Sequence, residues 1–175
     1  MEGRSPSGRE GAVGRPRPEQ ATRKRAPGQM PMDVSSILRR KGTEVEKALP
    51  GTKVGDAARR LTAKGVGSLA IVDEGGNLLG VLAERDLVRA LGEYGPSSWH
   101  LPVERVLESR PATCKPDDSL RAVMSVMTKR RARHLPVIAG EALVGLVSIG
   151  DVVKAQLEDL EREVGVLRDY VRARP

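Results

Sequence analysis

The sequence predicts an α+β protein of two β-α-β-β-α repeats that pack through their sheets, followed by a C-terminal helix. Three observations carry this prediction. The segment at 50–72 matches 116–138 at an offset of 66, and 78–90 matches 143–155 at an offset of 65. In each copy, apolar residues at helical spacing are followed by two short apolar runs. A copy of about 60 residues is marginal alone, so packing two sheets together is a natural way to complete a core.

The elements are expected in the same order in each copy. A short extended lead-in segment precedes Pro50 and Pro116, and a helix follows each proline. In the second copy the apolar residues of this helix stand at i, i+3, i+4 and i+7: Leu120, Val123, Met124 and Met127. The apolar runs predict four strands, at 68–72, 78–82, 134–138 and 143–147. A second helix is expected to begin near Asp86 or Asp151, directly after the last strand of its copy.

The repeats set the expected domain boundaries: a disordered basic tail at 1–32, the first repeat at 33–95, the second at 96–156 and a C-terminal helix at 157–175. The tail holds five prolines, five glycines and few apolar residues, so it cannot bury enough surface to offset the entropy of ordering. Met30 or Met32 is an alternative start of the chain, because sequence typical of ordered structure begins there.

The C-terminal segment carries an apolar stripe at alternating spacings of three and four: Leu157, Leu160, Val164, Leu167 and Val171. Two interpretations stay open at this point. The helix either lies on its own domain or associates with another copy of itself.

Composition narrows the classes of function. The formal charge is +7, of which +4 belongs to residues 1–32 and +3 to residues 33–175. The folded part is therefore nearly balanced, which argues against a DNA-binding domain. Aromatic residues make up only 2% of the chain, so a stacking platform for single-stranded nucleic acid is disfavoured. A single cysteine forms no internal disulfide, and no apolar run approaches the roughly 18 residues of a membrane span, so we expect a cytoplasmic protein without a membrane partner.

The last strand of the second copy runs directly into a polar motif. Residues 143–153 read LVGLVSIGDVV, with Ser148 and Asp151 at the expected start of a helix. The simplest interpretation is a capping box. The functional interpretation is a ligand site, because a carboxylate at a helix N-terminus can accept two hydrogen bonds from a sugar diol. The first copy has Ala83 at the serine position, which cannot cap, yet it keeps Asp86.

A basic pair stands at the start of the preceding strand of the second copy. Arg133 and His134 end the run KRRARH at 129–134. If the two strands form a hairpin, this pair lies close to the helix N-terminus, and a guanidinium with an imidazole there forms a candidate phosphate site. The alternative is a solvated basic edge. No second histidine or cysteine stands at metal-ligand spacing, so no metal site is expected.

These motifs resemble the cystathionine-β-synthase (CBS) domain family. The segments that carry the resemblance are GSLAIVDEGGNLLGVLAERDLVRAL and RARHLPVIAGEALVGLVSIGDVVKA. The family hallmark, G-h-h-[ST]-x-x-D with h apolar, is met in full by Gly145, Ser148 and Asp151. Gly80 and Asp86 meet it in part, since alanine replaces the hydroxyl residue. The resemblance covers 33–156, and the RRKG segment near its start is similar to stand-alone bacterial CBS-pair proteins.

The resemblance implies a Bateman module, in which two CBS repeats form two clefts related by pseudo-twofold symmetry. Such modules bind AMP, ADP or ATP, and sometimes NAD(H) or S-adenosylmethionine. The motif aspartate holds the ribose, and basic residues at the strand start meet phosphate. Carried over to this sequence, the better site comprises Ser148, Asp151, Arg133 and His134, with Ala48 and Pro50 from the lead-in segment of the other repeat. The weaker site comprises Asp86, Thr113, Cys114 and Arg85, with Gly67 and Ser68 where the basic pair would stand.

The expected function is that of a regulatory module which binds an adenosine nucleotide, works as a homodimer and acts on an unknown partner protein. We expect no catalytic activity and no required cofactor, although CBS pairs also occur inside IMP dehydrogenase. Outside the repeats the chain has no room for a catalytic barrel of about 250 residues. Two alternatives stay open: a structural CBS scaffold without a ligand, and nucleic-acid binding through the basic tail.

Overall fold

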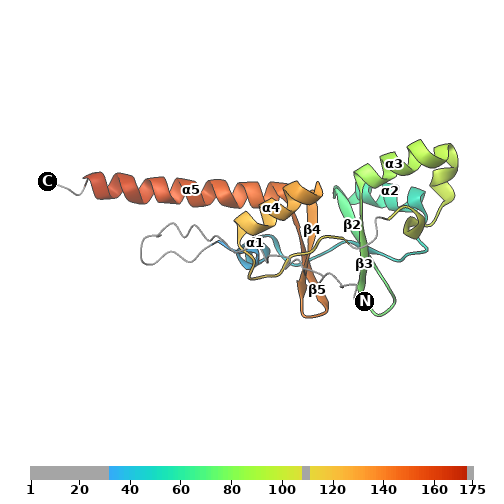
Figure 1. The fold of residues 1–175 in the computed structure, drawn as a ribbon, viewed down its shortest axis with the longest axis horizontal. Coiled ribbons are helices and arrows are strands. Elements are labelled where there is room, and N and C mark those ends of the chain that lie inside the picture. Colours follow the sequence, from blue (N-terminus) through green and yellow to red (C-terminus); the bar gives the residue numbers. More distant parts are fainter. Residues whose placement is uncertain (1–31, 108–110, 173–175) are drawn as a thin grey trace, which may run out of the picture. The chain divides into compact units, whose positions relative to one another are not determined.

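The computed structural model describes residues 32–107 and 111–172 (Figure 1). The predictions made for 1–31, including the disordered tail and the alternative start at Met30, lie outside the described residues. Within them the predicted α+β fold is confirmed, with two small sheets and their helices. No helix of this described part is long and apolar enough to cross a membrane.

Two antiparallel hairpins form the centre of the two repeats. In the first repeat, β2 (Ser68–Val72) pairs with β3 (Leu78–Ala83), and β1 (Lys47–Ala48) lies parallel to β2. In the second repeat, β4 (His134–Ala139) pairs with β5 (Ala142–Ser148). Both hairpins shift register at matching points, between Ile71 and Val72 and between Val137 and Ile138, so the internal repeat extends to this irregularity.

Each hairpin has one helix before it and one after it in the chain, in the order that the sequence predicts. These helices are α2 (Val54–Lys64) and α3 (Glu84–Tyr94) in the first repeat, and α4 (Leu120–Arg130) and α5 (Ile149–Arg172) in the second. Two short 3-10 helices, η1 (Gly95–His100) and η2 (Val103–Arg105), connect the repeats. The expected C-terminal helix is not separate, because α5 runs without a break from the Ser148 motif to Arg172.

The ends of α2 and α4 differ in a way that bears on the site. Both helices end on a residue in the left-handed conformation, which favours glycine because it has no Cβ. In α2 this residue is Gly65, with a φ of 62°, and in α4 it is Arg131, with a φ of 49°. Among the described residues, Arg131 is the only non-glycine residue with a positive φ.

The first helix of the described residues packs into the second repeat, which the sequence does not predict. α1 (Val34–Lys41) places Val34, Ile37 and Leu38 in the same buried cluster as residues of α4, β4, β5 and α5. Its N-cap, Asp33, accepts a hydrogen bond from the Ser36 N–H and forms a bridge with Ser119. The end of the helix is held by α5, where Arg40 pairs with Glu158.

A segment of the second repeat is in turn buried in the core of the first. Val103 and Val106 lie in the buried cluster of the first repeat, with Leu69, Ile71 and Leu82. The backbone N–H of Val103 donates to the carbonyl of Thr52 at 2.8 Å. The core of the second repeat therefore contains α1, and the core of the first contains residues of η2 and the segment after it, so the two repeats are mutually dependent.

Replacing Ile37 by alanine tests this dependence. The side chain is 1% exposed in the core of the second repeat. Its loss should lower the free energy of unfolding by about 2–5 kcal/mol, because a buried cavity is left behind. The matched control is Val88→Ala on α3, where the side chain is 72% exposed and the expected change is under about 0.5 kcal/mol. Urea unfolding followed by circular dichroism measures both, and equal midpoints for the two variants would contradict the exchanged packing.

Candidate functional site

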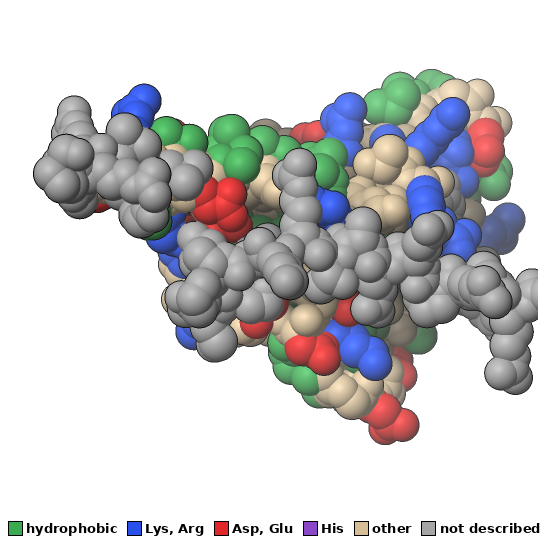
Figure 2. All heavy atoms as spheres, turned by 60° about the vertical axis from the view of Figure 1, so that its left-hand side comes forward, with side chains coloured by type: hydrophobic (Ala, Val, Ile, Leu, Met, Phe, Trp, Pro, Cys, Tyr) green, Lys and Arg blue, Asp and Glu red, His purple; other side chains and the backbone are tan. Residues whose placement is uncertain are grey.

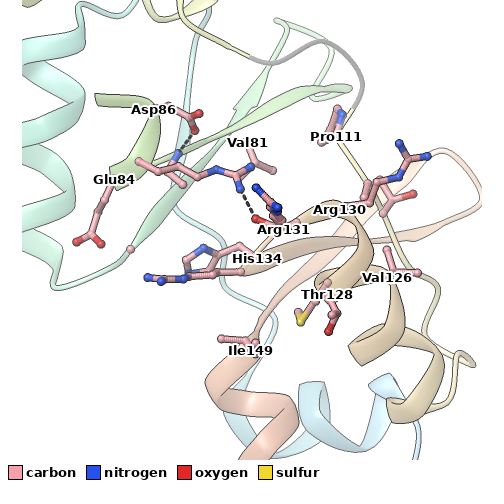
Figure 3. A pocket seen from close by; sticks show the side chains of 18 residues that line it. Val81, Glu84, Asp86, Pro111, Val126, Thr128, Arg130, Arg131, His134 and Ile149 are labelled. Atoms are coloured by element: carbon pink, nitrogen blue, oxygen red, sulfur yellow. Dashed lines mark hydrogen bonds between the residues drawn. The ribbon is translucent and has the colours of Figure 1, made fainter. Parts of the chain in front are cut away.

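A cavity of about 1260 Å³ lies where the two repeats meet (Figure 3). One wall comes from β3 and the start of α3, and the other from the end of α4 and the start of β4. The segment before Cys114 contributes Pro111, Ala112 and Thr113, and Ile149 contributes the first residue of α5. Both repeats thus supply side chains to one concave surface.

Asp86 stands at the first-repeat end of the cavity, in the first turn of α3. Its residue is 3% exposed, and its Oδ2 accepts the backbone N–H of Ala83 at 2.8 Å. Its Oδ1 accepts Nη2 of Arg89 at 3.1 Å, and the same nitrogen donates to the carbonyl of Val106 at 2.8 Å. A carboxylate has about four acceptor positions, so these two bonds leave capacity for a donor from a ligand.

Arginines dominate the opposite wall. Arg130, Arg131 and Arg133 line the cavity from the turn between α4 and β4, and Arg85 lines it from α3. Arg85 donates from Nη1 to the carbonyl of Arg131, so it joins the two repeats directly (Figure 3). The only carboxylates among the lining residues are Glu84 and Asp86. The four guanidiniums outnumber them, and the cavity attracts anions.

His134 lies between the two repeats, at the start of β4. Burial lowers the pKa of its imidazole, and Lys41 adds to this, while Glu84 and Asp151 work against it. Its Nδ1 is buried with no hydrogen-bond partner among the described residues. A Cβ at Gly67 would lie 3.1 Å from its Cε1, so the absence of a side chain at Gly67 of the first repeat makes room for the ring.

The motif of the second repeat forms a complete capping box. The backbone N–H of Asp151 donates to Oγ of Ser148 at 3.2 Å, and Oδ2 of Asp151 accepts the Ser148 N–H at 2.8 Å. The same oxygen accepts the Ser148 hydroxyl at 2.8 Å and Nζ of Lys41 at 2.6 Å. Burial works to raise the pKa of Asp151, but the bonds from Lys41 and Ser148 hold it below its ordinary value.

The structure groups the predicted site residues differently from the sequence expectation. Arg133 and His134 line the cavity of Asp86, together with Thr113 and Arg85 from the set expected to be weaker. Ser148 and Asp151 do not line this cavity, although Ser148 lies opposite His134 in the hairpin. The difference arises because the first residue of β4, with Arg133 before it, faces the first repeat as well as its own hairpin.

The other predicted residues lie away from the cavity lining. Ala48 is buried in the core of the first repeat, and the carbonyl of Pro50 accepts the N–H of Glu104. Cys114 is 4% exposed in the core of the second repeat, and burial, with a smaller contribution from Asp118, raises the pKa of its thiol to about 12. Among the described residues, no group of His, Cys, Asp or Glu is arranged to hold a metal ion.

Three basic residues near the two motifs were missed at the level of sequence. Arg130 and Arg131 belong to the basic run at 129–134, which is equally typical of a solvated edge. Lys41 belongs to the RRKG segment, and only the packing of α1 on the second repeat brings it to Asp151. The position of Arg131 opposite Gly65 in the repeat alignment was the available signal for a special backbone conformation.

The lowered pKa of His134 predicts a pH dependence of stability. The unfolded chain has a histidine pKa of about 6.5, above that of the folded state, so the unfolded state binds more protons below this pH. The contribution of His134 to the free energy of unfolding should therefore be fully present above pH 7. It should be lost as the pH is lowered through about 6.5 towards the pKa of the folded state. His134→Gln should flatten this part of the profile, whereas His100→Gln at an exposed position should leave it intact. A profile that is the same in both variants would exclude His134 as its origin.

Comparison with known proteins assigns both repeats to one domain family. The CBS domain family matches residues 34–93 and 103–158. The mitochondrial CBS domain-containing protein CBSX3 of Arabidopsis thaliana is 31% identical over 147 residues, covering 79% of this chain and 71% of that protein.

Two solved structures extend the comparison. The CBS-domain containing protein ATU1752 from Agrobacterium tumefaciens is 36% identical with a TM-score of 0.70, and the match covers 71% of this chain and 99% of that one. CBSX2, whose structure was solved in complex with AMP, is 26% identical with a TM-score of 0.59, covering 72% of this chain and 96% of that one. The chain therefore belongs to the CBS domain family and carries two CBS domains in tandem.

Proposed function

We propose that this CBS pair is a regulatory module that binds an adenosine nucleotide in the cavity between its repeats. The observation that carries the proposal is the pairing of Asp86, at the start of α3, with four arginines of the same cavity. In this arrangement the carboxylate accepts the ribose hydroxyls, and the phosphates lie towards Arg131 and Arg133. The AMP complex of the related CBSX2 supports this class of ligand.

The charge of the cavity favours anionic ligands within that class. AMP, ADP and ATP carry increasing negative charge, and NAD(H) carries a diphosphate. S-adenosylmethionine carries a positive sulfonium and no phosphate, so it gains nothing from the arginines. We infer that affinity rises from AMP to ATP and that S-adenosylmethionine binds weakly at this site.

The conformation of Arg131 is a second support. A left-handed residue other than glycine costs roughly 1–2 kcal/mol, and the first repeat avoids this cost with Gly65. An arginine kept at such a position is consistent with a role for its guanidinium at the cavity.

The cleft at Ser148 and Asp151 is the second candidate site, with Arg133, His134, Ala48 and Pro50 as its proposed companions. A specific observation weakens it: Asp151 lies outside the lining of the arginine-rich cavity, and its Oδ2 accepts Nζ of Lys41 at 2.6 Å. A nucleotide that binds there has to share or displace this cation. We therefore place the main ligand at Asp86.

A regulatory role follows from the place of the cavity, which takes its walls from both repeats. A ligand with different affinities for two packings of the repeats shifts their populations, and a partner protein reads the difference. We propose that the module has no catalytic activity of its own. It acts as a homodimer.

Calorimetric titration with AMP and ATP tests the site. Asp86→Asn should weaken binding about 10–100-fold, because it removes a charged acceptor; the amide oxygen can still accept the Ala83 N–H, the contact with Arg89 is lost, and circular dichroism checks that the variant is folded. The matched variant Asp151→Asn should change affinity less than about threefold at the Asp86 site.

The opposite ranking would move the ligand to the second motif. If AMP and ATP produce no binding heat with the parent chain and leave its melting temperature unchanged, the module is a structural scaffold without a nucleotide ligand. DNA binding with a steep salt dependence would favour the basic N-terminal segment as the functional part.

Arg131→Gly separates stability from binding at one position. Glycine relieves the left-handed strain, so the free energy of unfolding should rise by up to about 1 kcal/mol. Loss of the guanidinium should weaken ATP binding about tenfold and AMP binding less. Arg131→Lys, which keeps the charge and the Cβ, is the control. A glycine variant that binds ATP as tightly as the parent chain would show that Arg131 does not meet the phosphates.

A further inference from the structure

An apolar stripe on α5 lies exposed in the described structure. Its members are Val153, Leu157, Leu160 and Val164, with exposed fractions of 44%, 56%, 50% and 45%. Their spacings of four, three and four residues are those of the a and d positions of a heptad repeat. Figure 2 shows apolar side chains along the upper edge of the molecule, at the height where Figure 1 draws α5.

The stripe is separate from the face by which α5 packs on its own domain. That inner face is formed by Val152 and Ala155, both fully buried. The 24 residues of α5 span about 36 Å at 1.5 Å per residue, and from Leu160 to Val166 no described side chain is buried. The helix therefore continues past its core contacts with its stripe unpaired by any described residue.

We propose that this stripe pairs with α5 of a second copy, in a parallel two-stranded coiled coil. Leu157 and Val164 take the a positions, and Val153 and Leu160 take the d positions. The inference does not depend on the nucleotide site, because none of these four residues lines the cavity.

The flanking charges select the parallel orientation. In this heptad Glu163 is a g residue and Arg168 is the e residue of the next heptad, so they face each other across a parallel dimer and attract. In a fully overlapping antiparallel pair, Glu163 would face its own counterpart, and so would Glu161. Lys154 would then face Arg168, so all three flanking pairs would repel.

The chemistry of the stripe also argues for a second copy over the chain's own N-terminal segment. Residues 1–31 contain one valine and no leucine, isoleucine or aromatic residue. They offer no set of large side chains to fill the holes between the a and d residues of α5. A second α5 supplies the same stripe at the same spacing.

Disulfide trapping tests the pairing and its orientation together. In the parallel dimer the two Leu160 positions face each other, so Leu160→Cys should form a covalent dimer under mild oxidation. In the antiparallel pair Leu160 would face Val164, and the same variant would not cross-link. The control is Arg162→Cys at the f position, two residues later and on the opposite face of the helix, where the side chain points outward from the seam. The native Cys114 is buried and is present in both variants, so it sets the background level of disulfide cross-linking.

Sedimentation velocity of the full chain tests the energetic role of the stripe. Leu160→Glu should raise the dimer dissociation constant at least 100-fold, with an unchanged circular dichroism spectrum because the side chain is half exposed. Glu163→Arg should raise it about three- to tenfold, and the double variant Glu163→Arg/Arg168→Glu should restore it. A parent chain that is monomeric at all concentrations, or a Leu160→Glu variant that remains a dimer, would overturn the proposal. Cross-linking by Arg162→Cys instead of Leu160→Cys would overturn it as well.

Discussion

Neither repeat of this protein completes its hydrophobic core by itself, and the rest of the structure depends on this constraint. Ile37 of α1, in the first repeat, is buried in the second repeat, and Val103 of η2, in the second repeat, is buried in the first. Separating the repeats would open both cores at once. The walls of the cavity are therefore held together by folding, so a ligand does not have to supply the free energy that brings them together.

The same short motif serves two purposes in the two repeats. Ser148 and Asp151 form a full capping box, and Lys41 neutralises the carboxylate, so this copy closes on itself and ties α1 to α5. In the first repeat, alanine at the hydroxyl position leaves half of the box, and Asp86 is held by Arg89 beside a cavity lined with arginines. The two repeats thus differ in the hydroxyl of the cap and in the basic partner of the aspartate, and only Asp86 lines the arginine-rich cavity.

The sequence predicted local structure well and long-range packing poorly, for physical reasons. The strand at 68–72 was predicted to the residue, because apolar periodicity and the repeat alignment are local signals. The packing of α1 on the other repeat was not predicted, because an amphipathic pattern does not indicate which surface the helix covers. For the same reason Arg133 and His134 were assigned to their own hairpin, although they line a cavity shared with the neighbouring repeat.

One continuous helix joins the cavity to the exposed stripe. Ile149, the first residue of α5, lines the cavity, and Val153 begins the stripe one turn later. Lys41 and Arg40 bind the same helix from α1, through Asp151 and Glu158. Because an α-helix transmits a displacement along its axis as a rigid element, any shift of its first turn reaches the stripe. The first turn of α5 at the cavity and the residues of the proposed dimer seam are therefore parts of one continuous helix.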